Sequence, residues 1–294
     1  MMTMNCMRKK NLTGKMIECA ITTVETGRAP SLQSEFSKIL SKQLPVSHFF
    51  STRKGGVSTE NYASLNLGAF CGDDPVAVTK NRKILCDAIG IDVDRLIVPR
   101  ELHDNEIREI DPTFFNLSKE EQLNFVSTCD ALITNMQGVC LAVSTADCVP
   151  VLLYDKKLRI IAAVHAGWRG VVKRILPMTI QLMQAKYHSE VEDIIAVTGP
   201  CISVDSYQVN QDVVNEFQSV FEEDEMLHIL QPKENGTLFI DLKKAILIQC
   251  KKENLLDENI EIHSGCTFQT SELYFSARRD SVYSGRMLSG IFLR

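Results

Sequence analysis

The chain has 294 residues, of which 45% are hydrophobic and 23% charged, and its formal net charge is −5. Such a composition suits one large globular domain or two small ones, and the negative charge argues against a general nucleic-acid-binding protein. No apolar run reaches the roughly 18 residues of a membrane span. We see no signal peptide and no CxxC pair among the ten cysteines, so we expect a cytoplasmic protein with free thiols.

Residues 1–45 show little of the periodicity that indicates a helix or a strand, whereas the residues from His48 onward show it clearly. Residues 1–45 are interpreted as an extension or as a first strand or helix, with SEFSKILSKQL (34–44) as the helix candidate. His48–Thr52 predicts a strand. Residues 75–89 predict a helix, because Asp74 suits its N-cap, Pro75 its first turn and Gly90 its C-terminal end.

From residue 96 onward, strand-like and helix-like segments alternate with short connections. The predicted helices cover residues 112–126, 171–187 (with a kink at Pro177), 212–221 and 241–255. The β-rich segments cover 95–103, 105–110, 130–135, 139–145, 149–155, 159–166 and 193–199. The pattern predicts an α/β or α+β-like layered fold, with a mixed sheet flanked by helices. No linker divides the chain, so we expect a single domain over residues 46–294.

Two of these β-rich segments flank Lys156-Lys157 and predict a hairpin. If the two lysines form the turn, Cys148 and His165 face each other, with Cβ atoms about 4.5–5.5 Å apart. One metal ion can bridge that gap. Lys-Lys is not a preferred two-residue turn, and a slip by one residue would place the two side chains on opposite faces. The alternative is that both are ordinary core residues.

A third ligand is expected from another segment. His103 follows an apolar strand and lies in a polar loop, where functional groups are often found; His48 is the second candidate. One cysteine and two histidines match a catalytic zinc site with an open fourth position, and they suit zinc or copper better than magnesium. The Gly-Trp-Arg-Gly stretch after His165 opens a helix whose start suits an anion.

Several motifs occur in an order that resembles the YfiH/YlmD family, whose members are called laccase-domain or multicopper polyphenol oxidase proteins and, more recently, purine nucleoside phosphorylases. They are STRKGGVS, SLNLG, DDPVAVTKNR, LITNMQGVCLAVSTADCVPVLLYD, AAVHAGWRG, TGPCIS, CTF, YFSARRD and SGRML. The resemblance covers residues 46–294 and implies a compact α/β/β/α domain with one zinc ion. Carried onto this chain, the family's metal ligands are His103, Cys148 and His165.

The resemblance also implies an activity. The family is credited with phosphorolysis of adenosine, inosine and methylthioadenosine to base and ribose 1-phosphate, and with deamination of adenosine. This chain departs from the family at RELHD, where Glu101 replaces a glutamine and Asp104 a glycine. The two added carboxyl groups could change substrate polarity or rate.

We expect the following roles for residues in these motifs. In deamination zinc would activate a water molecule, with Asp147 as the proton carrier. Phosphorolysis needs cationic donors for phosphate, and Arg53, Arg169 and Arg278 are the candidates, each with a surface ion pair as the alternative.

Asn66 and Asn81 are expected to bind the ribose, with the ordering of loops as the alternative for both. The expected partners are therefore purine nucleosides and phosphate, with no nucleic acid and no membrane. The sequence does not predict an oligomeric state.

Three other functions are considered. Copper-dependent phenol oxidation by a four-copper laccase is excluded, because it needs more histidine ligands than the six in this chain; a single copper ion stays open. A cysteine hydrolase would use Cys148 as nucleophile and His165 as base. A metal-stabilised binding module would need a fourth protein ligand, for which no residue is evident.

Overall fold

The computed structural model describes residues 38–39, 41 and 44–294. Most of the helix predicted at residues 34–44 lies outside these residues. Its described part, Lys38–Ile39, is a strand (β1) that pairs antiparallel with β2 (Ser47–Ser51), so the helix prediction is wrong there.

Two mixed sheets form the centre of the molecule. The five-stranded sheet has the order β1-β2-β14-β6-β3, in which β14 spans Met287–Phe292, β6 Cys140–Thr145 and β3 Leu96–Ile97. The six-stranded sheet has the order β13-β9-β7-β8-β5-β4, with β13 at Ile260–Glu261, β9 at Ile194–Thr198, β7 at Val149–Asp155, β8 at Ile160–Ala166, β5 at Ala131–Thr134 and β4 at Ile107–Glu109. Each sheet holds parallel and antiparallel pairs.

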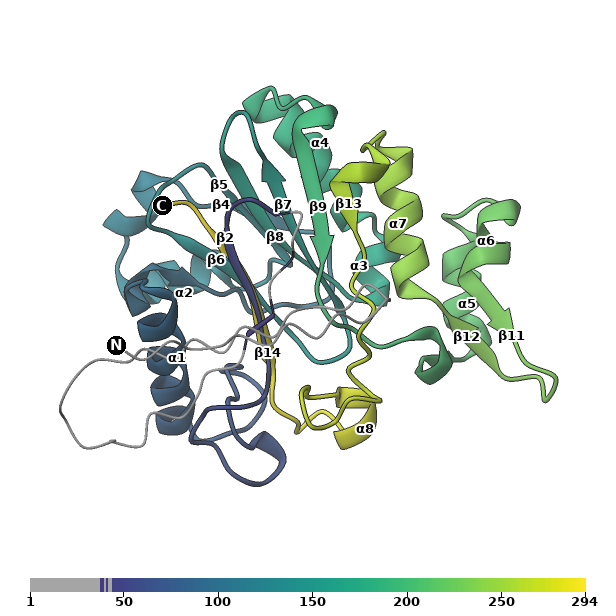
Figure 1. Cartoon of the computed structure of the whole chain (residues 1–294), viewed down its shortest axis with the longest axis horizontal. Coiled ribbons are helices and arrows are strands. Elements are labelled where there is room, and N and C mark those ends of the chain that lie inside the picture. The colour runs from purple at the N-terminus through teal and green to yellow at the C-terminus, as the bar shows by residue number, and fades with distance from the viewer. Residues whose placement is uncertain (1–37, 40, 42–43) are drawn as a thin grey trace, which may run out of the picture.

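The two sheets pack face to face, and helices cover their outer faces (Figure 1). The core between them includes Phe50 and Leu141 from one sheet and Leu152 and Val197 from the other. Helix α1 (Pro75–Ile89) packs on the five-stranded sheet, and α3 (Trp168–Val172), α4 (Ile175–Tyr187) and α7 (Leu242–Lys252) pack on the six-stranded sheet. Both sheets are therefore buried on two sides, which explains the continuous apolar strands and confirms the predicted layered single-domain fold.

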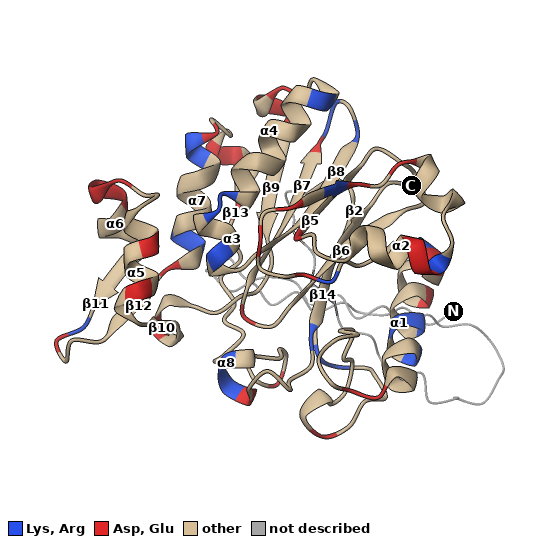
Figure 2. Ribbon diagram, turned by 180° about the vertical axis from the view of Figure 1, so that it is seen from behind, with Lys and Arg blue, Asp and Glu red and all other residues tan. Residues whose placement is uncertain are grey.

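The remaining elements lie around these layers. A small antiparallel sheet, β10 (Gln208–Val209), β12 (Leu238–Ile240) and β11 (Leu230–Pro232), groups with α5 (Gln211–Gln218) and α6 (Glu223–Ile229) at one end (Figure 1). Helix α2 (Lys119–Val126) precedes β5, and α8 (Ala277–Asp280) precedes β14. Acidic residues mark α5 and α6, whereas α8 carries basic ones (Figure 2). No helix in the described part of the chain is long and apolar enough to cross a membrane.

The β7–β8 hairpin forms with a register two residues away from the predicted one. Asp155 pairs with Ile160 and Pro150 with His165, so the loop holds four residues, 156–159, in place of two. The side chain of Asp155 accepts hydrogen bonds from two N–H groups of this loop, and Arg159 closes it at φ 56°. Because side chains alternate with a period of two, the slip keeps Cys148 and His165 on one face as diagonal neighbours.

Two predicted helices are each divided. The helix at 171–187 breaks at Arg174, which has φ 62°, and Pro177 lies in the first turn of α4. Proline is tolerated there, so the predicted kink at Pro177 is wrong and the break falls three residues earlier. The helix at 112–126 divides into a 3₁₀ turn at Pro112–Asn116 and α2, whose start is capped by Ser118.

Candidate metal centre

Three segments meet at one end of the neighbouring central strands β7 and β8 and bring together a cysteine and two histidines. Cys148 directly precedes β7, His165 lies near the end of β8, and His103 lies in the loop that follows β3. Their ligand atoms all lie within 4.8 Å of one another, and Cys148 Sγ is 3.7 Å from His103 Nε2. Zinc bond lengths in a tetrahedron require about 3.6 Å between a sulfur and a nitrogen ligand, so the three residues fit a zinc ion.

The alternative third ligand lies elsewhere. His48 is on β2 of the other sheet, where its two ring nitrogens contact the backbone N–H of Ser41 and the carbonyl of Val46. His103 is the histidine that the fold brings to Cys148 and His165.

Gly167 explains how the chain can pass so close to the ligands. A Cβ atom at this position would lie 2.8 Å from His103 Cδ2 and 3.0 Å from Cys148 Sγ. Any larger residue would therefore have to push the ligands apart. Gly167, which directly follows β8, is thus what allows the chain to pass this close to His103 and Cys148.

Asp130, which was not predicted from the sequence, holds two of the three ligands. Its carboxylate is fully buried, lies 2.7 Å from His165 Nδ1, and accepts hydrogen bonds from the backbone N–H groups of Leu102, His103 and Asp104. The contact to Nδ1 leaves His165 Nε2 as the ligand atom, as in carboxylate–histidine–zinc arrangements. The only sequence signal for this role is a polar residue immediately before a buried strand.

The charges of the site favour a thiolate even without a metal ion. Burial raises the pKa of the Cys148 thiol, but the nearby His165 and His103 outweigh it and lower this pKa to about 6. Burial opposes protonation of His165, yet Cys148 and Asp130 raise its pKa well above the ordinary value. A bound cation would take the place of the imidazolium proton as partner of the thiolate.

Asp147 lies beside the ligands in the chain, but its carboxylate is directed to other loops. It accepts hydrogen bonds from Thr267 Oγ1 at 2.6 Å, Ser276 Oγ at 3.0 Å and the backbone N–H of Arg278 at 2.7 Å. Both oxygens are thus engaged within the protein. A proton carrier at this position would have to exchange one of these donors for substrate.

The three predicted phosphate-binding arginines lie in different surroundings. Arg169 and Arg278 are exposed, and their guanidinium groups lie over the rings of Trp168 and Tyr207 at 4.3 and 5.1 Å. Arg53 lies over the Phe275 ring and donates to two backbone carbonyls, which orders the loops around it.

The two asparagines have the contacts of loop-ordering residues. Both are fully buried. Asn81 accepts from the N–H of Val57 and donates to Ser58 Oγ, and Asn66 accepts from the N–H groups of Gly68 and Arg286. These contacts correspond to the loop-ordering alternative raised for both residues.

The two carboxyl groups that depart from the family motif also have partners. Glu101 accepts hydrogen bonds from the N–H and the hydroxyl of Ser144, and Asp104 pairs with Lys173 at 2.6 Å. The ion pair between Asp104 and Lys173 is half-exposed, and ion pairs on the surface contribute little to stability. Neither carboxylate is among the residues that could hold the metal.

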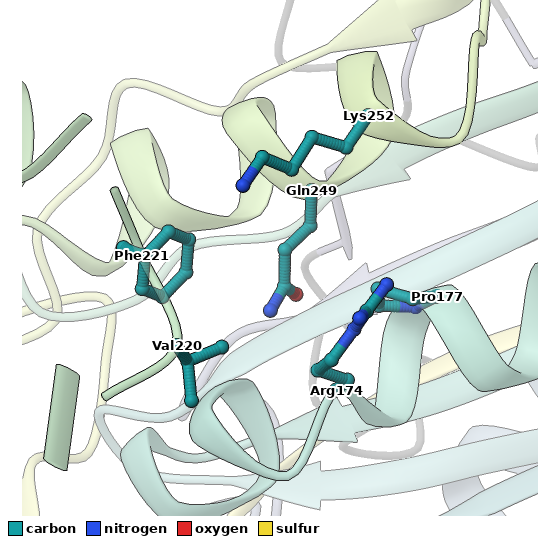
Figure 3. A pocket seen from close by; sticks show the side chains of 6 residues that line it. All are labelled: Arg174, Pro177, Val220, Phe221, Gln249 and Lys252. Carbon is teal, nitrogen blue, oxygen red and sulfur yellow. The ribbon is translucent and has the colours of Figure 1, made fainter. Parts of the chain in front are cut away.

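A separate cavity of about 40 Å³ lies between the start of α4, helix α7 and the segment that follows α5 (Figure 3). Gln249 donates to the carbonyl of Val171, and its buried Oε1 has no hydrogen-bond partner among the residues that the structure describes. The cavity suits a few water molecules. It is too small for a nucleoside, and is lined by Arg174, Pro177, Val220, Phe221, Gln249 and Lys252.

Comparisons with known proteins agree with this fold. Residues 47–294 match the family described as multi-copper polyphenol oxidoreductase laccase. A Bacteroides thetaiotaomicron protein named purine nucleoside phosphorylase is 37% identical over 86% of this chain and 94% of its own length, and one from an unknown prokaryotic organism, named adenosine deaminase RL5, is 35% identical over 83% and 92%. The crystal structure of YlmD from Geobacillus stearothermophilus is 27% identical and superimposes with a TM-score of 0.81, covering 90% of this chain and 98% of that one.

Proposed function

Because the chain belongs to the family described as multi-copper polyphenol oxidoreductase laccase, we propose that it is a zinc-dependent purine nucleoside phosphorylase that also deaminates adenosine. One relative is named for the first activity and another for the second, and each aligns with more than four fifths of the chain. The proposed substrates are adenosine, inosine and methylthioadenosine together with phosphate. The proposed catalytic domain is residues 46–294, acting in the cytoplasm.

The observation that carries the proposal is the geometry of His103, Cys148 and His165. Three ligands of these types, within 4.8 Å of one another, are the set that catalytic zinc uses when a fourth position is kept for water or substrate. His103 is exposed and Cys148 partly so, which gives substrate a way to the ligands. When bound, zinc would act as a Lewis acid that polarises an oxygen of water or phosphate.

Residues of this chain would supply the rest of the chemistry. In phosphorolysis a phosphate oxygen forms a bond to ribose C1′ while the bond from C1′ to the purine nitrogen breaks, and the base leaves with a proton. Arg169 and Arg278 are proposed to hold the phosphate, because guanidinium groups match its oxygens. Asp130 would keep His165 oriented. Asp147 is proposed to move the proton in deamination after releasing one of its present donors.

The experiment that tests the proposal is incubation of the zinc-loaded protein with adenosine, with and without phosphate, followed by chromatography. Adenine that forms only with phosphate indicates phosphorolysis, and inosine indicates deamination. The Cys148→Ala variant is the matched control and should form neither product. If the wild-type protein forms neither product from any of the three nucleosides, the proposal is wrong.

A cysteine hydrolase is the second candidate, because the pKa of Cys148 is lowered to about 6 and His165 lies beside it. Such a dyad would act as nucleophile and base. The two functions respond oppositely to metal: zinc would block the thiolate of a hydrolase, whereas the proposed phosphorylase requires it. Loss of activity on chelation therefore argues against the hydrolase.

A further inference from the structure

Tyr207 lies at the border between the small sheet and the candidate metal centre. It follows a 3₁₀ turn (Val204–Ser206) and directly precedes β10, and its half-buried ring packs against the main core. The guanidinium of Arg278 lies 5.1 Å from the centre of this ring and donates to the Gln208 carbonyl at 2.8 Å. Among the described residues, no hydrogen bond of the Tyr207 hydroxyl is found.

Arg278 connects this tyrosine to the metal ligands. Its backbone N–H donates to Asp147, whose chain neighbour is Cys148. Arg278 is therefore held at two points: its backbone N–H donates to the Asp147 carboxylate, and one N–H of its guanidinium donates to the Gln208 carbonyl. A guanidinium has five N–H donors, so the others stay available for a ligand.

Arg278 lies over the Tyr207 ring, and Arg169 lies on α3, which follows the strand that carries His165. Among the described residues, neither Arg169 nor Arg278 forms an ion pair, in contrast to Arg279, which pairs with Asp280, and Arg174, which pairs with Glu253. Figure 2 shows the basic residues of α8, Arg278 and Arg279, in blue. Two uncompensated guanidinium groups beside a site are the arrangement that attracts a polyanion such as phosphate.

The Tyr207 phenol, whose ring lies against the Arg278 guanidinium, stays protonated at neutral pH. Burial raises the pKa of Tyr207 most, and the Cys148 thiolate raises it further, while Arg278 and Arg169 lower it. A protonated phenol beside two cations can donate a hydrogen bond to an anion that they hold. The side chain is thus suited to a ligand that only accepts hydrogen bonds.

We infer that Tyr207 completes the phosphate subsite: its hydroxyl donates a hydrogen bond to the phosphate held by Arg278 and Arg169, and its ring keeps Arg278 in place. The inference deepens the proposed function and rests on it for the identity of the anion. It assigns the binding of one substrate, phosphate, to Tyr207, Arg278 and Arg169. Binding of the nucleoside does not depend on the Tyr207 hydroxyl.

The test is the Tyr207→Phe variant, which keeps the ring and its contact with Arg278 and removes only the hydroxyl. Loss of a hydrogen bond to a charged group should raise the KM for phosphate about tenfold. The KM for adenosine, the zinc content and the deamination rate without phosphate should stay as in the wild type. Tyr283→Phe, which changes an exposed tyrosine, is the matched control and should alter none of these values.

A merely structural role for Tyr207 would lower phosphorolysis and deamination together, and that result would overturn the inference. A KM for phosphate within about twofold of the wild type would overturn it as well. Calorimetric titration of the zinc-loaded protein with inorganic phosphate separates the inference about Tyr207 from the proposed function, because it measures phosphate binding without turnover. If the wild type binds phosphate more tightly than Tyr207→Phe but turns over no nucleoside, only the proposed function fails. If it does not bind phosphate, the inference fails.

Discussion

Asp130 receives hydrogen bonds from three consecutive backbone N–H groups of the 102–104 loop and contacts His165 at 2.7 Å. One buried carboxylate thus sets both the path of the loop that carries His103 and the orientation of the second histidine. Although burial opposes its ionisation, these partners lower the pKa of Asp130 below its usual value. The residue therefore stays charged and can accept all four donors.

We predict that Asp130→Asn weakens zinc binding by about 10–100-fold, the usual effect of changing a partner of a ligating histidine. The amide keeps one acceptor oxygen, but its NH₂ group faces N–H donors that the carboxylate now accepts. Competition with a chromogenic chelator measures the change. Asp104→Asn, which alters a neighbouring half-exposed carboxylate, should bind zinc as the wild type does. Equal affinity of Asp130→Asn and the wild type would contradict the assigned role.

Cys148 gives a prediction about pH. Its pKa of about 6 means that in the metal-free protein the reactive thiolate is present above pH 6 and is lost as the pH falls below it. Alkylation by iodoacetamide should therefore reach half its maximal rate near pH 6, well below the value of about 8.5 for an ordinary thiol. Peptide mapping identifies the modified cysteine, and added zinc should protect it. A half-maximal rate near pH 8.5 would refute the electrostatic description.

At the scale of elements, the β7–β8 hairpin separates what the sequence can predict from what it cannot. Its apolar segments predict both strands, and their period of two places Cys148 and His165 on one face. The register depends on the loop conformation, and a four-residue loop closed by Arg159 at φ 56° has no distinctive residue pair such as Asn-Gly. The sequence therefore predicts correctly that the two side chains share one face of the hairpin, but it does not predict which residues of β7 and β8 pair.

The site shows the same division. His103, Cys148 and His165 stand in recognisable motifs, and the fold brings them together as expected. Asp130 and Tyr207 act through contacts with segments far away in the sequence, and single-sequence patterns carry no information about such contacts. The layered order of helices and sheets was predictable, because strands buried on both faces must be covered on both sides.

Asp155 provides a test of the hairpin loop. Its Oδ1 accepts hydrogen bonds from the N–H groups of Lys157 and Leu158, while its buried Oδ2 has no hydrogen bond within the described part of the chain. Asp155→Ala should lower the free energy of unfolding by about 1–3 kcal/mol, because loop N–H groups lose their acceptor. Asp155→Asn keeps the acceptor and should cost less. Urea unfolding compares the two; equal losses would mean that the carboxylate oxygen does not hold the loop.

At the scale of the whole molecule, the ligands join segments that lie far apart in the chain. His103 comes from the loop that connects β3 of the five-stranded sheet to β4 of the six-stranded sheet, whereas Cys148 directly precedes β7 and His165 lies on β8. A metal ion held by all three residues therefore ties the loop between the two sheets to the ends of β7 and β8. Metal binding should for this reason be coupled to the stability of the entire fold.

We predict that zinc raises the melting temperature of the metal-free protein. At a free concentration 100 times the Kd, a ligand that binds only the folded state adds about 2.7 kcal/mol. Differential scanning calorimetry with and without zinc measures the shift. Cys148→Ala is the control and should show almost none. An identical shift in that variant would place the stabilising zinc elsewhere.

The central claim is that one zinc ion, held by His103, Cys148 and His165, is required for nucleoside phosphorolysis. The most direct measurement is phosphate-dependent release of adenine from adenosine as zinc is titrated into the metal-free protein. We predict that activity rises in proportion to added zinc and levels off at one equivalent per chain. Full activity in the zinc-free protein, or the same titration curve for Cys148→Ala, would contradict the claim.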